Sequence, residues 1–252
     1  MATPYVTHPL GEVDSTKDEA RRRASGDGAA EAILVVADRQ TSGRGRSGAA
    51  WVQAPRAMSA SLAVHPSWEP GEWPVIPLAA GLAARSALSE VCGVTPGLKW
   101  PNDLVLPTGK VGGILSEASG PVVVVGCGVN LWWPQPVDGA AAIHENDPGD
   151  GIAGDLAHVW ADELLVALER PAGAWGVDEY RAACVTLGTE IVWDGGIGRD
   201  SGRGIAVDVA SDGALVVAVA DGTIALRSGS VRSVGPASLP HLHPGDRGAE
   251  SS

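Results

Sequence analysis

A strand-turn-strand pattern between two lysines, Lys99 and Lys110, is the feature that most constrains the fold. Leu104-Val105-Leu106 and Ile114-Leu115 are short apolar runs of the kind that form strands. Between them stands Pro107-Thr108-Gly109, and proline with glycine supplies the backbone angles of a tight turn. The sequence therefore predicts an antiparallel hairpin, in which Lys110 leaves the turn and enters the second strand with its direction set by the pleat.

The composition makes these lysines informative. Fifteen of the eighteen basic residues are arginine, so lysine stands at only three positions. An ammonium is a compact point charge and a guanidinium is a planar fork, so a site that sets one cation against a small oxygen cluster cannot freely exchange them. Gly112 and Gly113 follow Lys110, and glycine within a strand often marks the close approach of a ligand or another backbone. We interpret Lys110 as a candidate anion-binding residue, whereas Lys99 could be structural.

Length, charge and cysteine content restrict the class of protein. A chain of 252 residues can form one larger domain and a small one. The formal net charge of −12 argues against nonspecific nucleic-acid binding, which requires clustered basic residues. The three cysteines are far apart and lack metal-ligand spacing, so we expect reduced, mostly buried thiols. We see neither a signal-peptide pattern nor an apolar stretch of membrane-spanning length, and we expect a cytoplasmic protein that binds neither nucleic acid nor membranes.

The period of the apolar residues changes along the chain. Through residues 1–186, short apolar runs alternate with helical patterns such as Val75 to Cys92, which stops at Gly93. Over residues 187–238 the period becomes two, which predicts a small barrel-like domain of short strands. We expect an α+β fold with a mixed β-sheet and flanking helices over 1–186, the small β domain over 187–238, and a disordered tail over 239–252.

Two polar segments are candidate binding elements. Ser15 and Thr16 precede a helix-favouring segment, and Thr16 has capping-box spacing with Glu19; a plain helix cap explains this pattern equally well. The loop that contains Arg44 and Arg46 alternates arginine with glycine, which suits it to gripping an anion.

Asn130 follows a β-branched run and the glycines of Gly126-Cys127-Gly128. Its amide could hydrogen-bond the edge of a heterocycle, or it could close a turn. The residues around it leave both interpretations open.

Five segments, taken in order, resemble the motifs of the biotin protein ligase family. They are Asp14-Ser15-Thr16, Gln40 to Arg46 with Trp51, Lys99 to Asp103, Lys110 to Leu115, and Gly126 to Asn130. The resemblance spans residues 12–235 and implies a class II synthetase-like biotin/lipoate ligase domain followed by an SH3-like β-barrel. Because only residues 1–11 precede it, the chain resembles the short class without an N-terminal DNA-binding domain.

The resemblance implies a two-step reaction. Biotin and MgATP give biotinyl-5'-adenylate and pyrophosphate, and a lysine of a biotin carboxyl carrier domain, part of a biotin-dependent carboxylase, then attacks the mixed anhydride. The implied biotin-binding residues are Ser15, Thr16, Lys17, Gln40, Arg44, Gly45, Arg46, Lys110 and Gly113. The implied nucleotide-binding residues are Arg44, Arg46, Trp51, Asn130 and Arg227. The implied catalytic residues are Lys110, Arg46 and Asp103, and Asp103 is a candidate ligand of Mg²⁺ or of the incoming lysine.

The sequence departs from the family pattern at three places. Lys17 stands where asparagine is usual, the loop Ser47 to Ala50 lacks the usual basic residues, and Glu190 occupies a position that is often basic. Two other functions therefore stay open: a lipoate or octanoate ligase or transferase on the same scaffold, and a non-catalytic module that binds biotin or its adenylate. If Arg44 and Arg46 are the only cations of this loop that bind the adenylate, we expect the adenylate to dissociate more readily.

Overall fold

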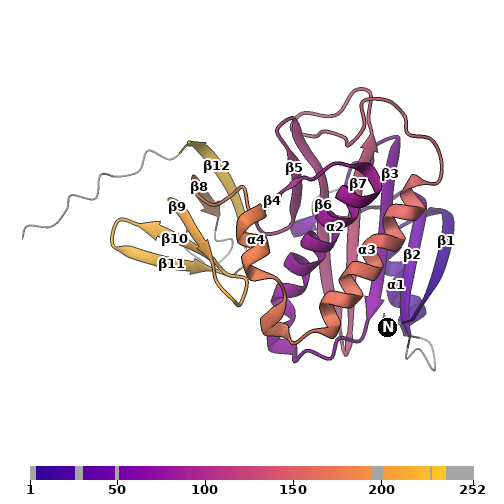
Figure 1. Cartoon of the computed structure of the whole chain (residues 1–252), viewed down its shortest axis with the longest axis horizontal. Coiled ribbons are helices and arrows are strands. Elements are labelled where there is room, and N and C mark those ends of the chain that lie inside the picture. The colour runs from indigo at the N-terminus through magenta and orange to yellow at the C-terminus, as the bar shows by residue number, and fades with distance from the viewer. Residues whose placement is uncertain (1–3, 26–30, 49–50, 195–200, 228, 237–252) are drawn as a thin grey trace, which may run out of the picture.

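The computed structural model describes residues 4–25, 31–48, 51–194, 201–227 and 229–236, so the predicted tail over 239–252 lies outside the described residues. Figure 1 shows a larger part built on a twisted sheet and a smaller part made of strands. The larger sheet has the order β1-β2-β3-β7-β6-β5-β4. Its strands are β1 (Tyr5–Val13), β2 (Ala32–Gln40), β3 (Arg56–Val64), β4 (Gly97–Lys99), β5 (Asp103–Leu106), β6 (Gly109–Ser119) and β7 (Val122–Trp132).

The sheet is mixed, because β1 and β2 run parallel while each further pair of neighbours is antiparallel. The predicted α+β class is confirmed. The hairpin around Pro107 is present as β5 and β6, so Lys110 does enter the second strand. β7 occupies the centre of the sheet, and Asn130 lies within this strand rather than in a turn.

Helices cover both faces of the sheet. α2 (Ile76–Cys92) and α3 (Ile152–Glu169) pack together on one face, and α1 (Thr16–Ala24) packs on the other (Figure 1). The side chains of β2 alternate accordingly: Leu34 joins the core under α2 and α3, while Val35 packs with the apolar residues of α1. α2 ends as predicted at Gly93, whose φ of 65° is the left-handed conformation of a helix C-cap.

Contrary to our expectation, the segment Pro70–Cys92 is long and apolar enough to cross a membrane by length and composition alone. In the structure its second part, α2, packs against both the sheet and α3, and nine of its residues are buried. This is the pattern of a core helix.

The predicted capping box at the start of α1 is wrong. Ser15 is the N-cap residue, and no side chain caps the helix. Thr16 is the first helical residue, and its hydroxyl bonds to Gln40 and Ser61, as described below. Glu19 pairs with arginines of its own helix instead of the N-cap amide.

The C-terminal part is a five-stranded antiparallel sheet of the order β11-β10-β9-β8-β12. It follows the short helix α4 (Val177–Ala183), and its strands are β8 (Thr189–Asp194), β9 (Gly202–Val209), β10 (Leu215–Val219), β11 (Gly222–Leu226) and β12 (Ser230–Pro236). No apolar pattern in the sequence indicated β12. Since β11 and β12 do not pair in the described part of the chain, closure into a barrel stays a prediction.

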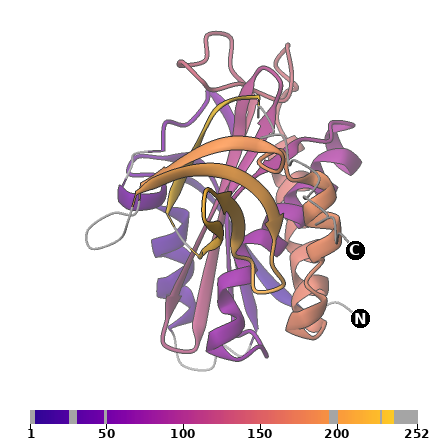
Figure 2. The same ribbon diagram turned by 90° about the vertical axis from the view of Figure 1, so that its left-hand side faces the viewer.

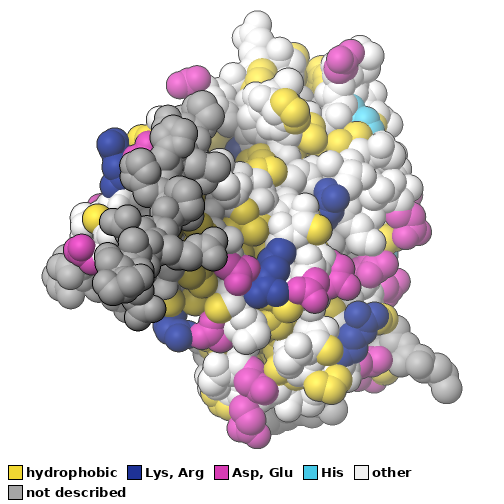
Figure 3. All heavy atoms as spheres, turned by 60° about the vertical axis from the view of Figure 1, so that its left-hand side comes forward, with side chains coloured by type: hydrophobic (Ala, Val, Ile, Leu, Met, Phe, Trp, Pro, Cys, Tyr) yellow, Lys and Arg dark blue, Asp and Glu magenta, His cyan; other side chains and the backbone are white. Residues whose placement is uncertain are grey.

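The two parts touch at a buried tryptophan. The indole Nε1 of Trp100 donates to the carbonyl of Gly213 at 3.0 Å, and the backbone N–H of Trp100 donates to Thr186 Oγ1 at 2.9 Å. Figure 2 shows the C-terminal strands lying across the face of the larger part that carries β4 to β6. On the face shown in Figure 3, acidic and basic side chains are interspersed rather than gathered into one basic patch.

Candidate active site

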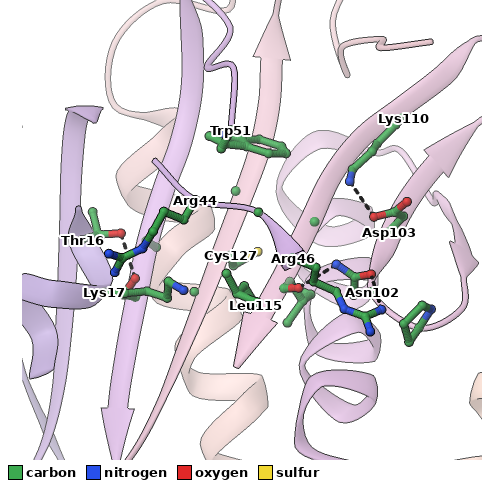
Figure 4. A pocket seen from close by; sticks show the side chains of 18 of the residues that line it. Thr16, Lys17, Arg44, Arg46, Trp51, Asn102, Asp103, Lys110, Leu115 and Cys127 are labelled. Carbon is green, nitrogen blue, oxygen red and sulfur yellow. Dashed lines mark hydrogen bonds and ion pairs between the residues drawn. The ribbon is translucent and has the colours of Figure 1, made fainter. Parts of the chain in front are cut away.

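The best-formed cavity lies above the middle of the large sheet, where β3, β6 and β7 meet the loop between β2 and β3, and its volume is about 270 Å³. Most of the residues singled out from the sequence line it (Figure 4). These are Thr16, Lys17, Gln40, Arg44, Gly45, Arg46, Trp51, Lys99, Asp103, Lys110 and Gly113. The sequence motifs are thus brought together although more than ninety residues separate the first from the last.

Paired glycines shape the floor of this cavity. Gly113 on β6 lies opposite Gly128 on β7. A side chain at Gly128 would bring its Cβ to 3.0 Å from the Trp51 ring, and one at Gly113 would bring its Cβ to 3.4 Å from Lys110 Nζ. Bare backbone therefore lets the indole lie close to the sheet at Gly128, whereas a Cβ at Gly113 would only touch the end of the Lys110 side chain.

One side of the cavity carries a cation and its counter-ion. Lys110 Nζ lies 2.6 Å from Asp103 Oδ1 and 5.8 Å from the centre of the Trp51 ring. The Lys110 side chain is 38% exposed, so its ammonium can reach a bound ligand. The indole Nε1 of Trp51 is buried and has no hydrogen-bond partner among the described residues. An unpaired buried donor costs free energy, which a ligand acceptor would recover.

Arg46, a predicted site residue, lies on the same side of the cavity. The sequence did not indicate that Asn102 contacts it. Asn102 donates from Nδ2 to the carbonyl of Ile114 at 3.0 Å, and its Oδ1 accepts a long contact of 3.4 Å from Arg46. Burial lowers the pKa of Arg46, and the nearby Asp103 carboxylate opposes that shift. A half-buried guanidinium held by a weak neutral contact is available to an anionic ligand.

The opposite side of the cavity is lined by polar side chains, among them Thr16 and Lys17 (Figure 4). Gln40 Oε1 accepts from the backbone N–H of Thr16 at 3.0 Å and from its hydroxyl at 3.1 Å. The Thr16 hydroxyl also lies 2.8 Å from Ser61 Oγ, which is buried on β3. The sequence offered no signal for Ser61, because a lone serine within a strand looks like any other strand residue. This network orients donors and acceptors toward the cavity without a full charge.

Lys17 lies on the same side, where its side chain is only 5% exposed. Its ammonium pairs with Glu117 of β6, which also pairs with Arg21. Burial lowers the pKa of Lys17, and Glu117 opposes this shift. Burial alone would raise the pKa of Glu117, but the hydrogen bonds and charges of Lys17 and Arg21 outweigh it and lower that pKa.

Arg44 also lines the cavity, with its guanidinium 2.6 Å from Asp18 Oδ1. Asp18 binds Arg21 as well, at 2.9 Å. Arg44 and Asp18 are both nearly half exposed, so this ion pair can exchange for a phosphate at little cost.

Three predicted residues do not line the cavity. Ser15 is buried beside it, with a hydroxyl that has no partner among the described residues. Asn130 donates to the carbonyl of Ala141 at 3.0 Å, while its Oδ1 is unpaired in the described part of the structure. Arg227 pairs with Asp212 and lines a smaller cavity, which Arg46 also borders. Their predicted roles in binding stay predictions.

The carboxylates of the site give a limited test of metal binding. No group of three or more histidine, cysteine or acidic side chains gathers anywhere in the described ranges. Asp103 is the single acidic residue on the cavity wall, and it is paired with Lys110. One carboxylate together with substrate phosphates and water is a donor set that Mg²⁺ accepts.

Comparison with known proteins identifies the family. The Biotin/lipoate A/B protein ligase family matches residues 11–130. A biotin--[acetyl-CoA-carboxylase] ligase of Mycobacterium tuberculosis is 32% identical over 234 residues, which cover 88% of this chain and 86% of the relative. The chain belongs to the biotin protein ligase family. Another family member, from Paracoccus denitrificans, is 35% identical over 172 residues, which cover 66% of this chain and 70% of the relative.

Solved biotin protein ligases have the same fold. The Aquifex aeolicus enzyme, solved in complex with biotin and ATP, has a TM-score of 0.74 at 26% identity, and the match covers 90% of this chain and 98% of that one. The Leishmania major enzyme, solved with biotinyl-5-AMP, has a TM-score of 0.60 at 29% identity. This match covers 87% of the present chain and 98% of the Leishmania chain. Both matches extend over most of the chain.

Proposed function

We propose that the chain is an ATP-dependent biotin protein ligase, which activates biotin as biotinyl-5'-adenylate and transfers the biotinyl group to a lysine of a biotin carboxyl carrier domain. The observation that carries this proposal is one cavity with two different ends, the first of which presents buried hydrogen-bonding groups and the second two cations. Thr16 and Gln40 stand at the first end, and Lys110 and Arg46 at the second. A ligand with a neutral polar head and a carboxylate tail fits this polarity.

In the first step, a carboxylate oxygen of biotin attacks the α-phosphorus of ATP. A carbon–oxygen–phosphorus link forms, and the bond from the α-phosphorus to the bridging oxygen breaks, so pyrophosphate leaves. Negative charge builds on the α-phosphate oxygens in the transition state. Lys110 and Arg46 are the cations placed to stabilise that charge, and the bare backbone at Gly113 lets the acid approach them. Trp51 offers an indole face and a free N–H to the nucleotide.

In the second step, the ε-amine of the carrier lysine attacks the carbonyl carbon of the adenylate. An amide bond forms, the bond to the phosphate breaks, AMP leaves, and the amine loses a proton. Asp103 stands at the open end of the cavity, where its carboxylate can accept a hydrogen bond from the arriving amine. We assign the partner as the carrier domain of a biotin-dependent carboxylase, because the relatives' names specify an acetyl-CoA carboxylase.

The remaining assignments belong to the same proposal. MgATP is the substrate, and Mg²⁺ bound to it would neutralise phosphate charge, with Asp103 as the available protein ligand. Residues 1–186 are assigned as the catalytic domain, and residues 187–238 as a small SH3-like barrel that brings Val231 to the cavity wall. Arg227 would complete the nucleotide site from that domain, and we place the enzyme in the cytoplasm.

The alternatives differ in the acid that is activated. A lipoate or octanoate ligase would adenylate those acids, and a non-catalytic module would adenylate none. The test is pyrophosphate release from MgATP by the purified chain, measured separately with biotin, lipoate and octanoate. We expect release with biotin at least 100-fold above the other acids, since a site with buried polar groups rejects ligands that leave those groups unpaired by such factors. Equal release with lipoate would refute the assignment of biotin.

A further inference from the structure

Lys17 is a buried cation that the reaction described above does not use. Its aliphatic stem runs across Gly126 of β7, where a Cβ atom would lie 3.1 Å from Lys17 Cγ and Cδ. The missing side chain at Gly126 thus makes room for the lysine. Lys17 lines the cavity on the opposite side from Lys110 (Figure 4).

Lys17 shares its counter-ion with a second cation. Glu117 pairs with Lys17 and also with Arg21, so the carboxylate is fixed on two sides. An ammonium has three N–H donors, and Glu117 is its sole hydrogen-bond partner in the part of the chain that the structure describes. The remaining N–H donors of Lys17 suit an acceptor such as a carbonyl, and the Glu117 carboxylate beside them would repel a second carboxylate.

The two ends of the cavity therefore differ in what they accept. The carboxylate of the acid belongs beside Lys110 and Arg46, which are reachable from the nucleotide side. The other end of the acid then meets Lys17 together with the Thr16 and Gln40 network. In biotin that other end carries a ureido carbonyl, whereas in octanoate it is a methyl group and in lipoate a dithiolane ring.

We propose that Lys17 is a specificity-determining residue, which donates a hydrogen bond to the ureido carbonyl oxygen of biotin and disfavours acids without an acceptor at that end. This inference rests on the proposed function. An acid with an apolar head would bury the remaining Lys17 donors without a partner. The free-energy cost of burying an unpaired charged donor is larger than the net stabilisation that its hydrogen bond would give. Glu117 is the positioning residue that holds the ammonium in place.

The test compares Lys17→Met with the wild-type protein. Methionine keeps the length and apolar stem of lysine, and Glu117 retains Arg21 as its partner. We expect the affinities for biotin and for dethiobiotin, which keeps the ureido group, to fall about 10- to 100-fold, as for loss of a charged hydrogen bond. The inhibition by octanoate, measured against biotin, should be unchanged or stronger, and KM for ATP should be unchanged. The matched control is Arg22→Met, on the exposed face of the same helix.

Two results would overturn the proposal. One is a biotin affinity retained within threefold in Lys17→Met, and the other is a parallel weakening of octanoate, which would indicate a merely structural role. If Lys17→Met does not fold, Glu117→Gln supplies the test. It keeps the donor and removes the counter-charge, so a dicarboxylate such as sebacate should inhibit at least tenfold better than it inhibits the wild type, with octanoate unchanged. Unchanged inhibition by sebacate would refute the role of the Glu117 carboxylate in disfavouring a second carboxylate at this end.

The failure of this proposal is distinguishable from failure of the proposed function. A wild-type protein that releases no pyrophosphate with biotin would refute the ligase assignment, whatever the variants do. A wild-type protein that activates biotin, together with a Lys17→Met variant of unchanged selectivity, would refute the role of Lys17 alone.

Discussion

Replacing Lys110 with methionine should nearly abolish adenylate formation while leaving the fold intact. The ammonium lies over the bare backbone at Gly113, where it can meet the charge that develops on the α-phosphate. Loss of one such group typically costs about 3 to 4 kcal/mol of transition-state stabilisation, which is about 100- to 1,000-fold in rate. Its ion pair with Asp103 is partly exposed, with the two side chains 38% and 23% accessible, and such pairs contribute about 0 to 1 kcal/mol to stability.

The assay is pyrophosphate release with saturating biotin and MgATP, followed beside thermal unfolding. The melting temperature should fall by no more than about 2 to 4 °C, the shift that corresponds to 1 kcal/mol in a chain of this size. Arg56→Met is the matched control, because Arg56 is 32% exposed and paired with Asp147 and Asp150 away from the cavity. A folded Lys110→Met variant with a rate within threefold of that control would refute the reasoning. Lys110→Arg should also be slow, since a planar fork does not replace a point charge.

Three further predictions follow from the geometry of the cavity. Gly128→Val should raise KM for ATP at least tenfold. The new Cβ would lie 3.0 Å from the Trp51 ring, so the larger side chain would push the indole aside. An unchanged KM in a folded variant would contradict this. Thr16→Ala should weaken biotin binding about 10-fold by calorimetry, as it removes a hydroxyl bonded to Gln40. Glu117→Gln should destabilise the protein most above pH 4.5 and progressively less below it. The pKa of Glu117 is lowered in the fold, so the stability from its ionised form is present above the unfolded value and is lost on acidification. A melting-temperature difference that is constant from pH 3.5 to 7 would exclude this.

Local patterns were sufficient to predict the large sheet and its helices. The hairpin around Pro107 and the helix that ends at Gly93 are each encoded within a few turns or residues. Two of the motifs that line the cavity, Gln40 to Arg46 and Lys110 to Leu115, were also recognisable locally, because each combines charged residues with glycine at short spacing. What such patterns could not show is which distant side chains meet.

The errors have physical causes of the same kind. Thr16 has the spacing of a capping residue, but tertiary hydrogen bonds to Gln40 and Ser61 take its hydroxyl. The ion pair of Lys17 joins it to Glu117, a hundred residues away, so no local spacing indicated it. Asn102 supports Arg46 through a side-chain contact that no sequence spacing indicates. The strand β12 was overlooked because Ser230–Pro236 contains few apolar residues.

Transfer of labelled biotin to a carrier domain tests the central claim most directly. The purified chain is incubated with MgATP, biotin and a biotin carboxyl carrier domain, beside the same domain with its acceptor lysine changed to arginine. We predict one biotin per intact carrier domain, dependent on ATP, and none on the arginine variant. A folded chain that releases no pyrophosphate with biotin and labels neither domain would contradict the account.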